Sequence, residues 1–203
     1  MIAPARSRTL ALALAFAFAF ALAGCGATAG DKMRADVTSF QKEQTAEKLF
    51  ERGKGFASVG DMTRAEEYLA AAIEAGADDR KVMPILLRVC AADHRYRVAI
   101  AYAEPYLQKH PDDVATHFVL GTLYAAVGEG AQAKVELQRV IAVKPNEANA
   151  HFALAVVMRD QDNDLAAADK HFREYLRLDP RGSHADEARA SLLKEVPPPS
   201  KAD

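Results

Sequence analysis

The fold is decided by residues 114–147, VATHFVLGTLYAAVGEGAQAKVELQRVIAVKPNE. This stretch ends in IAVKPNE, where Pro145 closes a helix. A similar setting, LQKHPDD with Pro111, comes 34 residues earlier, and LRLDPRG with Pro180 comes 35 residues later. Many Ala, Leu, Glu, Lys and Arg residues favour helix over sheet. The chain therefore repeats as four helical units, at residues 46–79, 80–113, 114–147 and 148–182.

A 34-residue period is the signature of the tetratricopeptide repeat (TPR), a helix–turn–helix unit. The third unit resembles that family at Leu120, Gly121, Tyr124, Ala133 and Pro145, with His117 where the family commonly has Trp. The first and fourth units match at further positions, namely Gly53, Phe56, Gly60, Asp61, Ala65, Leu69, Ala72, Leu154, Ala155, Ala168, Phe172 and Pro180. The second unit keeps Leu86, Ala99 and Pro111 but departs at Leu87 and Cys90. The resemblance covers residues 46–182 and implies an all-α, right-handed superhelical solenoid with one concave face.

The recurrence of small residues has a physical explanation that does not require the resemblance to the family. Small side chains let two antiparallel helices approach closely, and the apolar face left over by each pair requires neighbouring units to stack. After the last unit, Ser183 is the expected N-cap of a capping helix at residues 183–196, followed by a disordered tail at 197–203. In the second unit, we expect Pro84 to mark a late helix start or to lie inside the helix. Pro105 lies well inside its helix, where it should cause a kink.

Residues 1–24 are typical of a secretory signal peptide, with Arg6 and Arg8 before the apolar run TLALALAFAFAFALA. As a helix, this run spans about 22 Å, which is shorter than the hydrocarbon core of a bilayer, about 30 Å. The end of this segment, LAGC at residues 22–25, resembles the bacterial lipobox, which implies cleavage before Cys25 and acyl chains on it. Residues 25–45 then form a tether with a possible leading helix at 31–44. The expected location is a bacterial cell envelope, lipid-anchored at the outer membrane and facing the periplasm.

Composition and motifs exclude several classes of function. The chain has 203 residues and a formal charge of −2, without the basic excess of a nucleic-acid binder. Removal of residues 1–24 leaves 24 basic and 28 acidic residues, a charge of −4. Two Cys cannot form a disulfide framework, and Cys90 is interpreted as a buried, inert thiol. The six His form no metal-ligand pattern, and no catalytic motif is present. We therefore expect no enzyme activity, no cofactor and no metal.

The remaining candidate site is a peptide-binding groove on the first helices of the units. In proteins that this chain resembles, fixed positions of the first helix face the ligand, and the fifth positions here are Phe50, Pro84, Phe118 and Phe152. The other predicted groove residues are Glu47, Lys54, Lys81, Arg88, Thr122, Asn149, Val156 and Arg159. Apolar anchors flanked by cations suit an extended or helical peptide with apolar and acidic residues. The alternative is that the Phe side chains pack between successive first helices.

These observations predict a non-enzymatic scaffold that binds or positions another protein or peptide of the cell envelope. Acyl chains on Cys25 provide the contact with the membrane. Two more specific hypotheses remain open. One is a pilotin-like lipoprotein that assists secretin assembly for type IV pili, although such proteins usually carry more than four repeats. The other is an adaptor or regulator of a cell-wall hydrolase or synthase. Phe50 and Phe118 disfavour the carboxylate clamp that chaperone-binding members of the family use.

Overall fold

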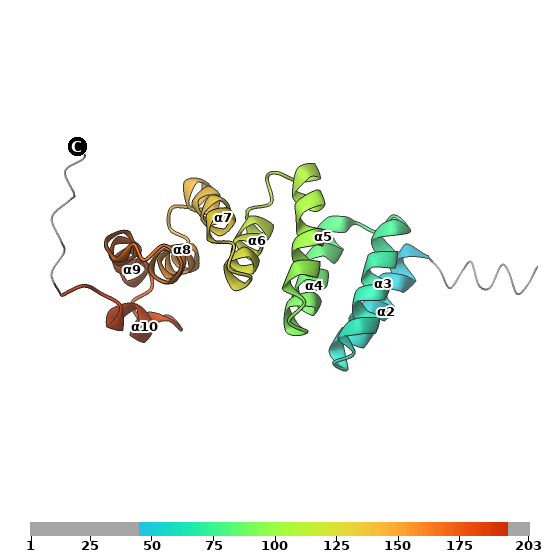
Figure 1. The fold of residues 1–203 in the computed structure, drawn as a ribbon. Coiled ribbons are helices and arrows are strands. Elements are labelled where there is room, and N and C mark those ends of the chain that lie inside the picture. Colours follow the sequence, from blue (N-terminus) through green and yellow to red (C-terminus); the bar gives the residue numbers. More distant parts are fainter. Residues whose placement is uncertain (1–44, 195–203) are drawn as a thin grey trace, which may run out of the picture. The chain divides into compact units, whose positions relative to one another are not determined.

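The computed structural model describes residues 45–194, and every regular element in that range is an α-helix (Figure 1). The helices are α2 (Ala46–Ser58), α3 (Met62–Glu74), α4 (Asp79–Ala92), α5 (Tyr96–Lys109), α6 (Val114–Ala126), α7 (Gly130–Val143), α8 (Ala148–Asp160), α9 (Leu165–Leu178) and α10 (Ala185–Ala190). The expected signal peptide, Cys25, the leading helix and the tail at 197–203 lie outside the described residues. No helix within residues 45–194 is long and apolar enough to cross a bilayer.

Each helix packs against the next one along the chain, which produces four helix pairs stacked in order, with α10 against α9 (Figure 1). The first helices of neighbouring units also touch, since α2 contacts α4, α4 contacts α6, and α6 contacts α8. This arrangement confirms the predicted all-α solenoid of tandem helix–turn–helix units. The second unit begins with α4 at Asp79, one residue before the expected start.

Small residues at two repeat positions set the distance between the helices of a pair. Ala65, Ala99 and Ala133 on the second helices are fully buried, and Ala168 is 2% exposed. On the first helices, a Cβ added to Gly53 would lie 2.7 Å from Leu69 Cγ, and one added to Gly121 would lie 2.9 Å from Leu137 Cγ. No side chain larger than hydrogen fits at either place without a shift of its neighbour.

The second unit accommodates its large residue by an exchange of sizes. Leu87 stands where Gly53 and Gly121 stand in their units, and it is 2% exposed. The position that holds Leu69 and Leu137 in those units holds Ala103, which is fully buried. The register therefore sets a large side chain on α4 opposite a small one on α5, the reverse of the order in the first and third units.

Both prolines of the second unit lie inside helices. Pro84 is the sixth residue of α4, so the expectation of a late helix start is wrong. Pro105 lies in the last third of α5. Both prolines are exposed, and the carbonyl groups that lose their hydrogen bonds belong to Arg80 and Ala101, which are also exposed. Solvent at these positions explains why both helices continue through the proline. The bend that we expect at these sites stays a prediction.

The closing helix α10 is shorter than predicted, at six residues, and begins after His184 rather than after Ser183. The N–H of His184 donates to the hydroxyl of Tyr175, which holds the chain out of helical geometry at this point. After Ala190, the Asp169 carboxylate accepts a hydrogen bond of 2.8 Å from the N–H of Leu193. Tertiary hydrogen bonds at both ends thus limit this helix, although α10 still covers α9 through the buried Ala185 and Ala188.

Candidate peptide-binding groove

Two pockets open along the row of first helices formed by α2, α4, α6 and α8. The aromatic pocket has a volume of about 450 Å³ and is lined by Phe118, Thr122, Ala125, Asn149, Phe152, Ala153, Val156, Ser183 and His184. The N-terminal pocket has a volume of about 380 Å³ and is lined by Lys54, Ala57, Ser58, Met62, Ile85, Arg88, Val89 and Ala92. Neighbouring units therefore supply the walls of each pocket.

The aromatic pocket brings together five of the residues predicted from the repeat register, namely Phe118, Thr122, Asn149, Phe152 and Val156. Phe118 and Thr122 come from α6, whereas Phe152 and Val156 come from α8. The described lining of this pocket contains no Asp, Glu, Lys or Arg side chain. A hollow of this composition favours an apolar side chain as its occupant.

The ring of Phe152 both packs internally and faces the pocket. It stacks on His184 with a centroid distance of 4.2 Å, and it also contacts Tyr175 at 5.3 Å and Phe172 at 5.8 Å. These contacts fix the orientation of the ring, and the Phe152 side chain remains partly exposed. Phe118 likewise packs against the core and lines the pocket. The two interpretations of the Phe positions are thus compatible rather than exclusive.

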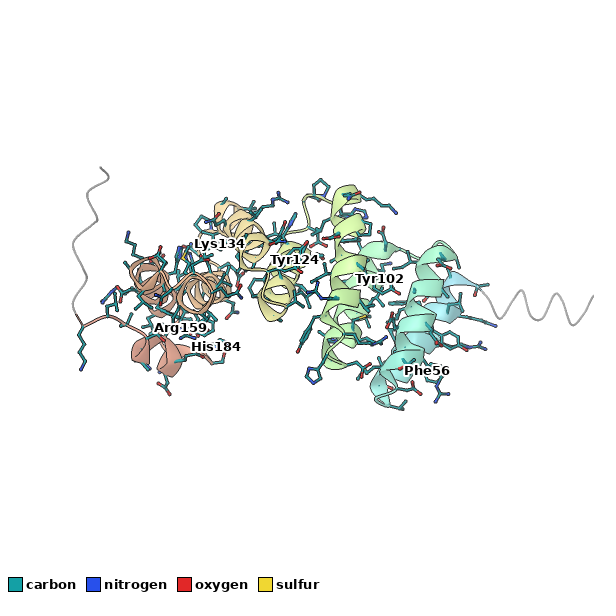
Figure 2. All side chains as sticks on the ribbon, in the orientation of Figure 1. Phe56, Tyr102, Tyr124, Lys134, Arg159 and His184 are labelled. Carbon is teal, nitrogen blue, oxygen red and sulfur yellow. The ribbon has the colours of Figure 1, made fainter. Side chains whose placement is uncertain are left out.

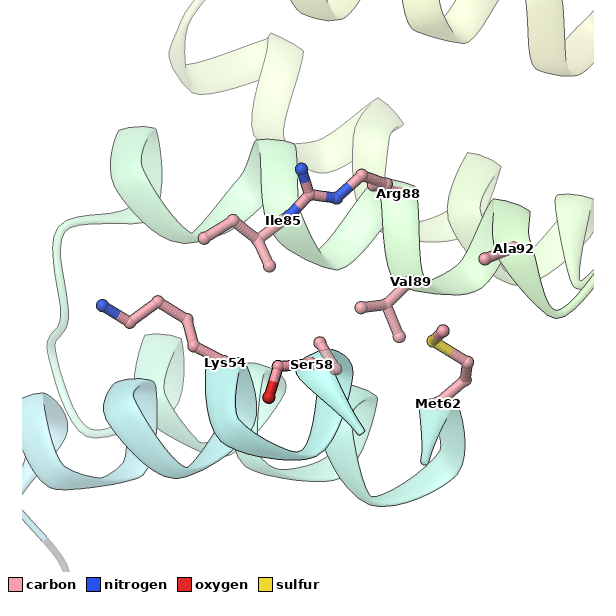
Figure 3. Close-up of a pocket in the computed structure, with 8 residues that line it drawn as sticks. Lys54, Ser58, Met62, Ile85, Arg88, Val89 and Ala92 are labelled. Carbon is pink, nitrogen blue, oxygen red and sulfur yellow. The ribbon is translucent and has the colours of Figure 1, made fainter. Parts of the chain in front are cut away.

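The N-terminal pocket combines an apolar floor with two cationic side chains, Lys54 from α2 and Arg88 from α4 (Figure 3). Lys54 is paired with Glu51 at 2.6 Å, and its ammonium lies 4.7 Å from the ring centre of Phe50. Arg88 is exposed and has no ion pair or hydrogen bond with any residue between 45 and 194. Its guanidinium is free to bind a carboxylate from another molecule.

Five predicted groove residues line neither pocket, namely Glu47, Phe50, Lys81, Pro84 and Arg159. Phe50 lies beneath Lys54, and Lys81 is 74% exposed with a long ion pair of 3.6 Å to Asp78. Arg159 lies at the junction between α8 and α10 (Figure 2). Its guanidinium binds Asp160, Glu187 and Ser191, at 2.6, 3.1 and 2.7 Å. The Arg159 guanidinium therefore helps to hold α10 against α8.

Buried polar residues in the repeats have structural partners. His117 and His151 are 2% and 6% exposed, and both are hydrogen-bonded within the solenoid, as a packing role requires. Cys90 is fully buried, and burial raises the pKa of its thiol to about 12, which keeps it protonated at neutral pH. Among residues 45–194, no three His, Cys, Asp or Glu side chains are grouped to hold a metal ion.

Sequence reasoning missed His184 and Ser183, which form one end of the aromatic pocket. These residues follow the last unit, so the repeat register assigns them no groove position. It also missed Met62 and Ile85, which lie in the N-terminal pocket at positions outside the ligand-facing set. In the sequence, Ile85 is only an apolar residue one helical turn before Arg88, which is weak evidence for a pocket residue. The packing of α2 against α4 is what identifies it as part of the pocket.

Residues 91–157, from the end of α4 through most of α8, match the model of a tetratricopeptide repeat family. No curated protein matches the sequence. Among solved structures, a tetratricopeptide repeat protein from Parabacteroides merdae matches with a TM-score of 0.65 and 20% identity, over 73% of this chain and 59% of that one. The chain thus spans less than two thirds of that protein.

Two further structures are similar over most of their own length. YrrB, described as a TPR protein with an unusual peptide-binding site, has a TM-score of 0.66 and 15% identity, over 78% of this chain and 88% of YrrB. MamA from Desulfovibrio magneticus, from its residue 41 to its end, has a TM-score of 0.61 and 20% identity, over 70% and 80%. At these identities the likeness concerns the fold. The fold and the family match together support a TPR solenoid, the class of protein–protein interaction scaffolds that are generally not enzymes.

Proposed function

We propose that this protein is a lipid-anchored scaffold of the bacterial cell envelope, which faces the periplasm from the outer membrane and holds another envelope protein in its groove. The TPR fold supports the scaffold function. The described peptide-binding site of YrrB, a protein of similar fold, supports a peptide as the ligand. The lipobox at residues 22–25 supports the anchor. Lipid supplies the location, and the groove supplies recognition.

The observation that carries this proposal is the aromatic pocket between α6 and α8. Phe118 and Phe152 come from equivalent positions of neighbouring units, and their rings are held by packing before any ligand arrives. Preorganised aromatic rings around an uncharged hollow are typical of the anchor point of a protein interface. The pocket thus takes one large apolar side chain of the partner.

The chemistry of the N-terminal pocket defines a second feature of the partner. Arg88 lies beside the apolar side chains of Ile85 and Val89, and its guanidinium has no ion pair or hydrogen bond to any residue from 45 to 194. Charge complementarity favours a carboxylate next to an apolar residue at this place. The partner that fits both pockets is an extended segment of an envelope protein, with an apolar anchor for the aromatic pocket and an acidic residue for Arg88.

The groove is tested by affinity capture from detergent-solubilised envelopes with the full-length protein. We expect Phe118→Ala/Phe152→Ala to lose the captured partner. A matched control is Val135→Ala/Val143→Ala, which removes two apolar side chains that are 54% and 61% exposed on α7. Equal recovery of the partner by a folded groove variant would refute the site. The identity of the captured protein, a secretin or a cell-wall hydrolase or synthase, distinguishes the more specific hypotheses.

The anchor is tested separately with Cys25→Ala. If Cys25 carries the acyl chains, this variant stays uncleaved and takes up no radioactive palmitate, whereas the wild type does. Cys90→Ala is the matched control, because Cys90 is fully buried in the solenoid. Normal palmitate labelling of Cys25→Ala would exclude the lipobox interpretation without affecting the groove.

A further inference from the structure

Two histidines occupy the same repeat position on α6 and α8. His117 and His151 are both buried, and the Nε2 atom of each faces the carbonyl oxygen of the proline that closes the preceding unit. The distances are 3.2 Å to the oxygen of Pro111 and 3.0 Å to that of Pro145. Because a carbonyl oxygen only accepts, each ring donates through its Nε2–H. Each histidine thus joins its unit to the one before.

In the third unit, the other ring nitrogen faces a carboxylate. Nδ1 of His117 lies 2.5 Å from Oε2 of Glu136 on α7. An ionised carboxylate only accepts hydrogen bonds, so this nitrogen carries hydrogen as well. In this unit a carboxylate from the second helix therefore accepts the hydrogen bond of the histidine, and the Arg139 guanidinium lies 3.5 Å from the same ring nitrogen.

In the fourth unit, a second histidine takes the place of that carboxylate. His171 on α9 stands at the repeat position of Glu136, and its Nδ1 lies 3.0 Å from Nδ1 of His151. Since His151 donates through Nε2, its Nδ1 accepts in the neutral ring and His171 donates. A proton added to Nδ1 of His151 would direct two N–H groups at each other. Burial and the adjacent His151 lower the pKa of His171, in agreement with this geometry.

The charged groups around the pair do not replace the missing carboxylate. On α9, Lys170 opposes protonation of His171 and Glu174 favours it. Glu174 is engaged by Arg177 through contacts of 2.6 and 2.9 Å. Toward α7, Lys144 and Glu147 flank Pro145 in sequence, and Glu147 contributes its backbone carbonyl to the N–H of His151. The hydrogen bond between the two Nδ1 atoms therefore persists only while one of these atoms carries no hydrogen.

Each histidine of this pair is next in the chain to an aromatic residue that forms or supports the aromatic pocket. His151 precedes Phe152 in α8, and His171 precedes Phe172 in α9. The ring of Phe152 rests on Phe172 and on Tyr175, both of which are fully buried on α9. Separation of α8 from α9 at the histidines would remove the support of Phe152, a wall of the pocket.

We propose that the His151–His171 pair is an acid-operated release for the aromatic pocket, through which a fall in pH loosens α8 from α9 and frees the partner. This regulation rests on the proposed groove function. The opened state exposes both rings and binds more protons than the closed state. The closed state is therefore favoured above the ordinary histidine pKa of about 6.5 and is weakened as the pH falls below it. One added proton increases the opening equilibrium by up to about tenfold per pH unit.

The test is amide hydrogen exchange of the full-length, partner-free protein at pH 7.5 and pH 5.5, with intrinsic rates corrected. We expect opening of α8 and α9 to increase several-fold at the lower pH, while α6 and α7 change little because Glu136 pairs with His117. His171→Glu places a carboxylate at the position that Glu136 holds in the third unit. This variant should abolish the difference in acid response between the α8–α9 pair and the α6–α7 pair. His171→Gln, whose amide can donate to His151 Nδ1, is the second variant and should also abolish it.

Equal exchange of α8 and α9 at both pH values would overturn the proposal, as would an acid response that persists in both His171 variants. The measurement uses no partner, so its result does not depend on whether the aromatic pocket is the binding site. Conversely, loss of the groove function in Phe118→Ala/Phe152→Ala leaves the exchange result of the wild type unchanged. The two proposals can therefore fail independently.

Discussion

At the scale of single residues, side-chain size decides how closely two helices approach. Gly121 lies against Leu137, and the Ala133 carbonyl oxygen is 3.3 Å from the place where its Cβ would be. The sequence predicts Gly121 as a contact point from its repetition in the units, because glycine destabilises a helix and recurs inside one where close packing requires it. That Phe152 both packs internally and lines the pocket could not be predicted, because its ring stacks on His184, which lies beyond the repeats.

Substitution of two helical glycines separates packing from helix propensity. We expect Gly121→Ala to lower the free energy of unfolding by about 1–3 kcal/mol, because the new methyl group overlaps Leu137. Gly55→Ala should raise it by about 0.5–1 kcal/mol, because alanine favours the helix and the Cβ position at Gly55 is open space. Urea unfolding followed by circular dichroism measures both changes. Equal effects at the two positions would contradict the close approach.

At the scale of helices, the second unit shows what the repeat pattern leaves undetermined. The sequence marks Leu87 as a departure, but its compensation by Ala103 lies on another helix and follows only from the register of the pair. The α10 boundary is a similar case. Ser183 is a good N-cap residue, yet the hydrogen bond from His184 to the Tyr175 hydroxyl determines where the helix begins. Tertiary contacts of this kind override local preference.

The exchange of sizes in the second unit predicts energetic coupling. Leu87→Ala should cost about 2–5 kcal/mol through the cavity that it leaves. Ala103→Leu should cost about 1–3 kcal/mol through overpacking. In the double variant, the new leucine occupies the vacated space, so the loss should be smaller than the sum of the two single losses. A double-mutant cycle by urea unfolding measures this, and strict additivity would exclude the pairing.

The attachment of α10 predicts a local effect of Arg159. The Arg159 guanidinium binds Glu187 and Ser191 and lies 5.4 Å from the ring centre of Phe172. We expect Arg159→Ala to accelerate tryptic cleavage after Arg189 several-fold, while the partner is still captured. Lys81→Ala, at an exposed residue of the N-terminal part, should leave cleavage after Arg189 unchanged. Loss of partner capture with normal proteolysis would instead support a groove role for Arg159.

At the scale of the whole molecule, stacking places residues from different units in one pocket. The 34-residue period predicts which helices share a row, and for this reason Phe118, Thr122, Phe152 and Val156 are predictable from the sequence alone. The period does not determine which cations stay free. Arg88 remains unpaired within residues 45–194, whereas Arg159 is used by α10. The Arg159 charge is neutralised in part by Glu187 on α10, which lies outside the repeats, so the repeat spacing cannot predict this pairing.

Site-specific photo-crosslinking in cells tests the groove most directly. The full-length protein carries p-benzoylphenylalanine in place of Val156, in the aromatic pocket, or in place of Val143, which is exposed on α7 and lines neither groove pocket. We predict that light produces an adduct of defined mass with another envelope protein from position 156 and none from position 143. Adducts from position 143 alone, or none from position 156 in a protein present at wild-type level, would contradict it.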